Sequence, residues 1–360
     1  MDKTSLHKKR GSRSRGRKWP TAVDLYCGSG AVSQALKQTH YRVVAAVDND
    51  PDACKTYGLN HPRVALYEED IHRVSPTEIL KSNLDGKPLD LLVVCAPCQP
   101  FSSQNSKRGN PKDQRRNLIL ESVRFAEILK PKAIFFENVA GLTTAKFGSL
   151  LTKLGQDLEA LGYTLEAPQR VDAASFGVPQ RRLRCIMIAH KANHFAIKDL
   201  ADIRDQVTTV RDAIGNLPRL SSGEACGKDP LHSARVHSDL TLKRLKLIPR
   251  NGGSRFSLPK ELELECHKGF KGHPDVYGRM KWDDVAPTLT TGCTDLTRGR
   301  YAHPEQDRSI TVREAALLQT FPRDYVFVGS SGSLSRQIGN AVPVLMAHKI
   351  FKSIRPILLD

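Results

Sequence analysis

The stretch Leu91-Leu92-Val93-Val94-Cys95-Ala96-Pro97-Cys98-Gln99 joins a continuous apolar run to a cysteine. A second apolar run, Ala133-Ile134-Phe135-Phe136, is followed by Glu137-Asn138-Val139. Continuous apolar runs are typical of strands that are buried on both faces of a parallel sheet. Because open α/β sheets bind ligands at the carboxyl ends of their strands, the two runs predict that Cys98 and Glu137 lie at one edge of a sheet. A nucleophile and an acid at one edge indicate an enzyme.

Strand-like and helix-like patterns alternate over residues 20–190. Strands are predicted at 21–26, 42–47, 64–67, 89–95, 132–137, 163–166 and 183–189, and helices at 30–38, 51–58, 76–82, 117–130 and 147–161. This alternation predicts an α/β fold with a mainly parallel sheet that is covered on both faces. Helical periodicity returns at 309–320 and 340–356, so we expect residues 301–360 to pack back on a first domain at 19–194.

The alternation stops over residues 195–300, which are rich in Gly, Pro, Ser and basic residues. Residues 235–300 contain 13 Lys or Arg against 8 Asp or Glu. We expect a second, smaller domain of short irregular strands that serves as a contact surface. Residues 1–18 hold eight Lys or Arg against one Asp. This basic tail is either a disordered arm or a nonspecific contact to phosphates.

The bulk composition favours a polyanionic partner. The 360 residues carry a formal net charge of +17, which attracts nucleic acid. No run of about 18 apolar residues occurs, so we expect no membrane span and a cytoplasmic, nucleoid-associated location. The eight cysteines are scattered, which suggests reduced thiols rather than disulfides. Their spacing and that of the histidines match no common zinc module, so no metal site is predicted.

Three strand ends suggest a ligand that contains adenosine. Asp24-Leu25-Tyr26-Cys27-Gly28-Ser29-Gly30 places a glycine turn after the first strand, but the chain has no P-loop motif for phosphate. Asp48 ends the second strand and could bind ribose hydroxyls, whereas Asp50 suits a helix cap better. Asp70-Ile71 follows the third strand and could contact adenine. S-adenosylmethionine fits, because it has adenosine and no phosphate.

The reactive residues each have a second interpretation. Cys98 could be an inert buried thiol, but the preceding proline, Gln99 and the charged loop that follows favour a nucleophile. Glu137 could be a surface carboxylate or, if partly buried, a proton donor. Strand alternation places Arg182 and Arg184 on one face, where they form a solvated basic patch or bind a base carbonyl and a phosphate.

The polar loop from Cys98 to Asn117 contains five Lys or Arg and one Asp. Long loops inside compact domains are usually functional or disordered. We expect a mobile basic lid that closes on a polyanion.

Taken together, these segments resemble the DNA (cytosine-5)-methyltransferase family in its compact bacterial or phage form. The resemblance covers nearly the whole chain after the tail. The matching segments are Asp24 to Gly30, Asp48, Asp70-Ile71, Pro97-Cys98-Gln99, Glu137-Asn138-Val139, the Q-x-R-x-R segment Gln180 to Arg184, Thr288-Leu289, Arg308 to Pro322 and Gln337 to Pro343. Two departures are minor: Asp48 stands where Glu is more frequent, and Ala31 where a second glycine is common.

The resemblance implies a fold and a reaction. The fold is the Rossmann-like sheet of S-adenosylmethionine-dependent methyltransferases with a target-recognition domain at 195–300. Cys98 would add to C6 of a cytosine that is flipped out of duplex DNA, Glu137 would hold N3, and Arg184, beside Arg182, would bind the carbonyl side of the ring. Carbon 5 would then accept the methyl group.

The resemblance also implies the remaining binding residues and partners. The cofactor-binding residues are Asp24, Tyr26, Gly28, Gly30, Asp48, Asp70, Ile71, Pro97 and Asn340. The substrate-binding residues are Gln99, Ser102, Asn138, Gln180 and Thr288. Duplex DNA is the expected substrate, a cognate restriction endonuclease encoded nearby is a candidate partner, and a monomer is the expected state.

Two other functions share this fold. An RNA cytosine-5 methyltransferase, in particular one that acts on transfer RNA, would also be basic, but the sizeable 195–300 region favours duplex DNA. A catalytically inactive DNA-binding paralogue is the second alternative. Against it, the reactive residues and the cofactor acids are all present together: Cys98, Glu137, Arg182, Arg184, Asp48 and Asp70.

Overall fold

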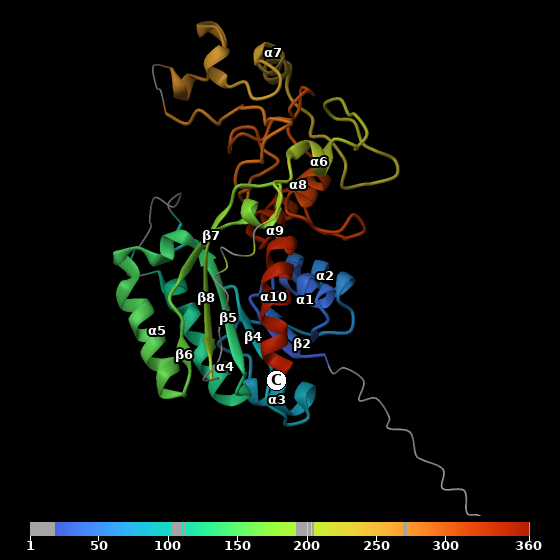
Figure 1. The fold of residues 1–360 in the computed structure, drawn as a ribbon. Helices are drawn as coiled ribbons and strands as arrows, with labels where there is room; N and C mark the ends of the chain where they lie inside the picture. Colours follow the sequence, from blue (N-terminus) through green and yellow to red (C-terminus); the bar gives the residue numbers. More distant parts are fainter. Residues whose placement is uncertain are drawn as a thin grey trace, which may run out of the picture.

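A central sheet organises the larger, lower part of the molecule (Figure 1). This computed structural model describes residues 19–102, 110, 113–191, 200, 203, 205–268 and 272–359. Within them, the strand order is β3-β2-β1-β4-β5-β8-β6, and β7 pairs with β8. The predicted tail at 1–18 and residues 103–109 and 111–112 of the predicted lid lie outside the described residues.

The sheet is parallel at its centre and antiparallel at one side. The parallel strands are β1 (Thr21–Leu25), β2 (Arg42–Asp48), β3 (Ala65–Glu68), β4 (Leu91–Val94) and β5 (Ala133–Val139). The antiparallel strands are β6 (Thr164–Leu165), β7 (Gln169–Asp172) and β8 (Leu183–His190). The prediction of a mainly parallel α/β sheet is confirmed. Strand β7 was not predicted, because three of its four residues are polar.

Side chains alternate along the central strands, so each strand contributes to two cores. Leu91 and Val93 of β4 face one core, and Leu92 and Val94 face the other. The first core contains α1 (Ala31–Gln38), α8 (Val312–Leu318) and α10 (Val344–Leu359), and the second contains α3 (Pro76–Leu84), α4 (Glu121–Leu129) and α5 (Gly148–Ala160). The C-terminal helices α8 and α10 therefore pack in the same core as α1.

Helix boundaries follow local chemistry. Asp50 caps α2 (Pro51–Asn60) through its side chain, and a proline occupies the first helical position. The helix predicted at 117–130 is instead a 3₁₀ segment, Gln114–Leu120, followed by α4. The helix predicted at 340–356 is also wrong at its start. Helix α9 (Ser331–Asn340) ends there and α10 begins at Val344, because Pro343 lacks the N–H that a continuous helix needs.

The smaller, upper part contains α7 (Asp239–Leu247) and three short 3₁₀ turns (Figure 1). Besides these helical segments and α6 (Val210–Ile214), the described residues of 205–300 form isolated β-bridges and no strand, so the short strands expected there are wrong. A small core fills this part, made of Leu245, Ile248, Leu258, Tyr277, Leu296 and Ala302. Helix α6 and Trp282 belong instead to the core shared with the sheet. The boundaries at 195 and 300 stay a prediction.

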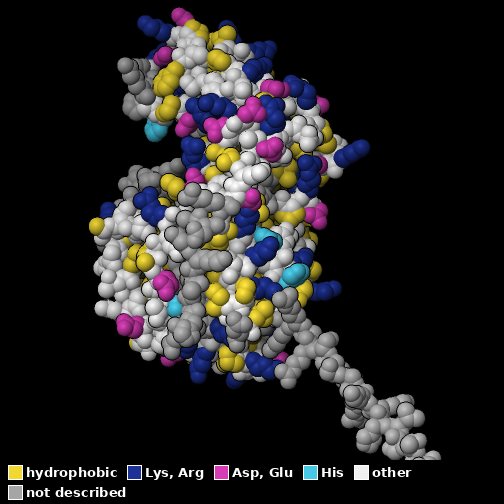
Figure 2. Space-filling model, in the orientation of Figure 1, with side chains coloured by type: hydrophobic (Ala, Val, Ile, Leu, Met, Phe, Trp, Pro, Cys, Tyr) yellow, Lys and Arg dark blue, Asp and Glu magenta, His cyan; other side chains and the backbone are white. Residues whose placement is uncertain are grey.

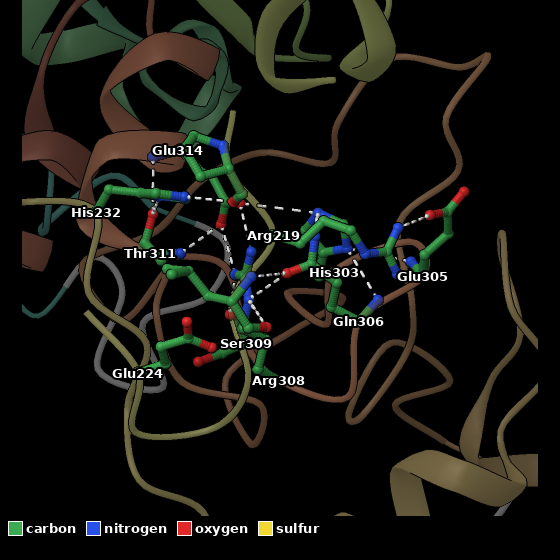
Figure 3. A network of polar contacts seen from close by, with 12 residues as sticks. Arg219, Glu224, His232, His303, Glu305, Gln306, Arg308, Ser309, Thr311 and Glu314 are labelled. Atoms are coloured by element: carbon green, nitrogen blue, oxygen red, sulfur yellow. Dashed lines mark hydrogen bonds and ion pairs between the residues drawn. The ribbon is translucent and has the colours of Figure 1, made fainter. Parts of the chain in front are cut away.

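A buried ion pair lies at the start of α8, in the segment that returns from the smaller part (Figure 3). The guanidinium of Arg308 donates to both carboxylate oxygens of Glu314 at 2.8 and 2.7 Å, and neither side chain is more than 1% exposed. Glu314 also accepts from the N–H of Thr311 in the capping box that begins α8. Burial alone would raise the pKa of Glu314, but the hydrogen bonds and charge of Arg308 outweigh it and lower the pKa to about 2.

Two buried histidines belong to the same network of polar contacts (Figure 3). His303 Nδ1 accepts from the N–H groups of Glu305 and Gln306, which assigns its proton to Nε2, 3.7 Å from Glu314. His232 Nε2 lies 2.9 Å from the carbonyl of Pro218 and therefore donates to it. Burial lowers the pKa of His303 to about 4, so its ring stays neutral at physiological pH.

Replacing Glu314 by glutamine removes the counter-charge of Arg308 but keeps the shape of the side chain. We expect the free energy of unfolding to fall by about 3 kcal/mol, because a buried charge without its partner is costly. Asp157→Asn is the matched control, because its i,i+4 pair with Lys153 is partly exposed and contributes at most about 0.5 kcal/mol. Urea unfolding followed by circular dichroism measures both variants. A Glu314→Gln midpoint equal to that of the wild type would contradict the prediction.

Candidate active site

A cavity of about 460 Å³ opens at the carboxyl ends of the parallel strands. Its walls come mainly from the loops after β1 to β4, from Glu137 in β5 and Arg184 in β8, from the 3₁₀ segment and from α9. Of the residues predicted for the site, those that line the cavity are Tyr26, Gly28, Asp48, Asp70, Ile71, Pro97, Cys98, Gln99, Glu137, Arg184 and Asn340. The sheet therefore brings together both the predicted adenosine contacts and the predicted reactive groups.

One end of the cavity is acidic and partly apolar. Asp48 accepts from the N–H of Gly28 at 2.8 Å and from that of Asp50 at 2.9 Å, so the glycine turn and the end of β2 fix its carboxylate. Burial raises the pKa of Asp48, and these two backbone hydrogen bonds oppose the shift. Asp70 and the buried Ile71 line the same cavity after β3. Carboxylate acceptors beside an apolar side chain suit the hydroxyl and amine groups of a nucleoside.

The other end contains an ion pair and a thiol. Arg184 Nε lies 2.7 Å from Glu137 Oε1, and their side chains are 9% and 10% exposed. Burial raises the pKa of the Cys98 thiol; the guanidinium of Arg184 opposes this shift, whereas the carboxylate of Glu137 adds to it. The thiol therefore keeps its proton at neutral pH. The arrangement offers a nucleophile, a carboxylate and a fixed guanidinium to one ligand.

Hydrogen bonds hold the two reactive loops together. The N–H groups of Phe101 and Ser102 both donate to the carbonyl of Cys98, at 3.0 and 3.1 Å, so the chain turns directly after the cysteine. Asn138 Nδ2 donates to the carbonyl of Ala96 at 3.0 Å, which ties the end of β5 to the loop that bears Cys98. Ser102 and Asn138 do not line the cavity and instead shape its walls.

Two residues of the predicted glycine turn lie behind the cavity wall. Asp24 is fully buried and accepts from Ser33 Oγ at 2.7 Å, and burial raises its pKa to about 7. Gly30 has a φ of 92°, and a Cβ there would lie 2.6 Å from His61 Nε2 and 2.7 Å from Tyr325 Oη. Position 30 therefore requires glycine, both for the backbone conformation and for the close packing.

The two arginines that the Q-x-R-x-R motif specifies, Arg182 and Arg184, have different surroundings. Arg184 lines the cavity, whereas Arg182 donates to the carbonyls of Leu289, Gly339 and Ala341 at 2.8, 2.8 and 3.0 Å. These contacts favour a positioning role for Arg182 over the expected contact to base or phosphate.

Gln180 and Thr288, predicted to bind substrate, also lie in this contact region away from the cavity. The side-chain oxygen of Gln180 accepts from the N–H of Leu289 at 3.0 Å. Thr288 Oγ1 donates to the carbonyl of Arg181 at 2.7 Å. Both residues therefore join β8 to the segment that returns from the smaller part.

The sequence predicted no role for several polar residues of the cavity wall, among them Ser29, Arg336 and Gln337. Ser29 lies inside the predicted glycine turn. Arg336 and Gln337 lie on α9, which was not predicted, although Gln337 begins the matching segment Gln337 to Pro343 and Arg336 directly precedes it.

The described residues lack two kinds of feature. None of their helices has the length and apolar character needed to cross a membrane. Nor do three or more His, Cys, Asp or Glu side chains of this part of the chain gather in a way that could hold a metal ion.

The chain is similar to bacterial type II modification enzymes. It is 39% identical to the type II methylase M.HgiDII of Herpetosiphon aurantiacus, covering 92% of this chain and 94% of that protein. It is 32% identical to the type II methyltransferase M1.HphI of Haemophilus parahaemolyticus, covering 93% of this chain and 86% of that protein.

Solved structures share the fold. The structure described as a prophage-encoded DNA modification methyltransferase (E. coli) matches with a TM-score of 0.76 at 23% identity, covering 95% of this chain and all of that one. Dnmt2 of S. pombe matches with a TM-score of 0.61 at 19% identity, covering 94% and 99%. The model of the C-5 cytosine-specific DNA methylases matches residues 21–356. The chain therefore belongs to the C-5 cytosine-specific DNA methylase family.

Proposed function

We propose that the cavity binds S-adenosylmethionine and that its methyl group is transferred to carbon 5 of a cytosine in a specific duplex DNA site. As a member of its family, the chain is a DNA (cytosine-5)-methyltransferase of the type II restriction–modification kind. The observation that carries the finer proposal is the single cavity that joins Cys98, Glu137 and Arg184 to Asp48 and Asp70.

The acidic end fits the nucleoside of this cofactor. Asp48, held by the glycine turn, would accept from the ribose hydroxyls, and Asp70 would accept from the exocyclic amine of adenine. Ile71 would cover the adenine face, beside Tyr26 and Pro97, and Asn340 would contact the cofactor from α9. The wall offers no Walker-type phosphate loop, which suits a nucleoside without phosphate. When bound, the cofactor supplies an electrophilic methyl group.

The other end fits a cytosine ring. Cys98 would lose its proton and form a bond to C6, which makes C5 electron-rich. Glu137 would hold N3 and stabilise the charge that develops on the ring. Arg184 keeps the Glu137 carboxylate in place through the 2.7 Å ion pair and presents a guanidinium beside the ring carbonyl. After C5 has accepted the methyl group, the C5 proton would pass to water and the bond between C6 and the Cys98 sulfur would break, which restores the aromatic ring.

This reaction requires the cytosine to be flipped out of the DNA double helix, because a thiol cannot reach the ring of a stacked base. Figure 2 shows a notch between the two parts of the molecule, with Lys and Arg side chains on the smaller part and around the notch. We infer that duplex DNA lies in this notch on a monomer and that residues 195–300 read its sequence. A cognate restriction endonuclease would act on the same site, and the enzyme would work at the nucleoid, where its DNA is.

Mapping 5-methylcytosine tests the proposal directly. Duplex DNA and, separately, transfer RNA are incubated with the protein and methyl-labelled S-adenosylmethionine, and the products are sequenced for modified cytosines. We expect label at one short recurring DNA site. Cys98→Ser should lower the rate by more than about a thousandfold, because the nucleophile is lost, while gel-shift binding to DNA persists. Label in RNA alone would favour a transfer-RNA methyltransferase, and an unlabelled wild-type reaction that still binds DNA would favour an inactive paralogue.

Glu137→Gln should lower kcat about a hundredfold or more, because a neutral amide stabilises the developing charge less well and leaves Arg184 without its counter-charge. Glu166→Gln is the matched control: its partner, His190, lies at the far end of β8 from Arg184. Steady-state rates on the mapped site compare the two variants. Equal kcat values for both would remove Glu137 from the mechanism.

The raised pKa of Cys98 predicts how the thiol reacts in the absence of DNA. Alkylation by iodoacetamide requires the thiolate, so the rate at Cys98 should still rise steeply between pH 7 and pH 9, by up to about tenfold per pH unit. Mass spectrometry of the peptide that contains Cys98 separates this rate from those of the other cysteines. A rate that is already constant above pH 7 would show that the thiolate is preformed.

A further inference from the structure

Some polar residues of the cavity wall have no role in the proposed contacts to the nucleoside and the cytosine. Ser29 lies in the turn after β1, and Arg336 and Gln337 lie on α9. All three line the same cavity as Asp48 and Cys98. S-adenosylmethionine carries, besides its nucleoside and its reactive methyl group, an amino-acid end with one carboxylate and one ammonium group.

Arg336 is a cavity guanidinium without a counter-charge. Three arginines line the cavity. Arg184 pairs with Glu137 at 2.7 Å, and Arg115 pairs with Asp113 at 2.8 Å. Within the described ranges, no carboxylate pairs with Arg336, whose side chain is exposed at the cavity wall. A planar guanidinium with free donors suits the carboxylate of a ligand.

Gln337 supplies a free acceptor next to this cation. Its Nε2 donates to the carbonyl of Val328 at 2.9 Å and to Ser333 Oγ at 3.2 Å. Because a carbonyl can only accept, the amide orientation is fixed and Oε1 remains as the acceptor. Gln337 is 6% exposed, and its Oε1 is buried without a partner in the described part of the chain.

Ser29 presents a second buried polar atom on the opposite element. The residue is 4% exposed, and its hydroxyl oxygen also has no hydrogen-bond partner among the residues that the structure describes. Buried polar atoms normally have partners, so two such atoms in the wall of one cavity point to a polar ligand group.

We propose that Arg336, Gln337 and Ser29 hold the amino-acid end of the methyl donor. Arg336 pairs with the α-carboxylate, Ser29 Oγ donates to the same carboxylate, and Gln337 Oε1 accepts from the α-ammonium group. This assignment rests on the proposed function, because it takes S-adenosylmethionine as the ligand. It gives α9 a direct share in cofactor binding beyond Asn340, and it gives each charged group of the amino acid a partner of the right kind.

Calorimetric binding without DNA tests the assignment, since no turnover occurs. The ligands are S-adenosylmethionine and its decarboxylated form, which keeps the sulfonium and ammonium groups but lacks the carboxylate. For Arg336→Gln we expect Kd for S-adenosylmethionine to rise about tenfold, as for the loss of a charge-assisted hydrogen bond, and Kd for the decarboxylated ligand to change less than about twofold. Arg336→Lys should recover part of the loss. Arg323→Gln, an exposed arginine outside the cavity, is the matched control and should bind both ligands as the wild type does.

The outcomes separate this inference from the proposed function. Wild-type protein that binds S-adenosylmethionine, with an Arg336→Gln variant that binds it equally well or loses both ligands to the same extent, would overturn the subsite alone. Wild-type protein that binds neither ligand would overturn the proposed methyl donor and the subsite with it. A thermal unfolding midpoint for each variant shows that a change in Kd does not come from misfolding.

Discussion

Three segments that are far apart in the chain meet at the guanidinium of Arg182. It donates to the carbonyls of Leu289, Gly339 and Ala341, and so connects β8, the segment that returns from the smaller part, and the end of α9. Hydrogen bonds from a charged donor are stronger than those between neutral groups, and a fully desolvated guanidinium is stable only where carbonyls or carboxylates surround it. Because Asn340 and Ala341 line the cavity, the same contact also fixes the cavity wall.

Close backbone packing reinforces this connection. A Cβ at Gly339 would lie 2.2 Å from the carbonyl oxygen of Thr290, so only glycine allows α9 to approach the returning segment this closely. Thr294 and Ser335 add a hydrogen bond of 2.7 Å between the same two segments. Helix α9 therefore both lines the cavity and packs against the segment that returns from the smaller part, although more than a hundred residues separate β8 from α9 in the chain.

The sequence predicted the site best where a reactive residue lies at the end of an apolar strand. The apolar runs before Cys98 and Glu137 predicted their common edge, because buried parallel strands have a distinctive pattern. It was least informative for buried polar residues: nothing in the spacing of Gln180 and Arg182 tells whether their partners are ligand atoms or backbone carbonyls. Helix α9 was missed because Ser331–Asn340 is mostly polar and owes its place to packing against the segment at 290–294.

The protonated state of Cys98 has a consequence for the lifetime of the enzyme. Peroxide and other oxidants attack thiolates far faster than thiols, and the first product, a sulfenic acid, leads on to irreversible forms. A partly buried thiol beside a carboxylate is therefore less open to oxidation while it keeps its proton. In the proposed mechanism, the thiol would lose its proton only as it forms its bond to a base in the cavity. Resistance to oxidation between turnovers and reaction with the bound base would then have one physical origin.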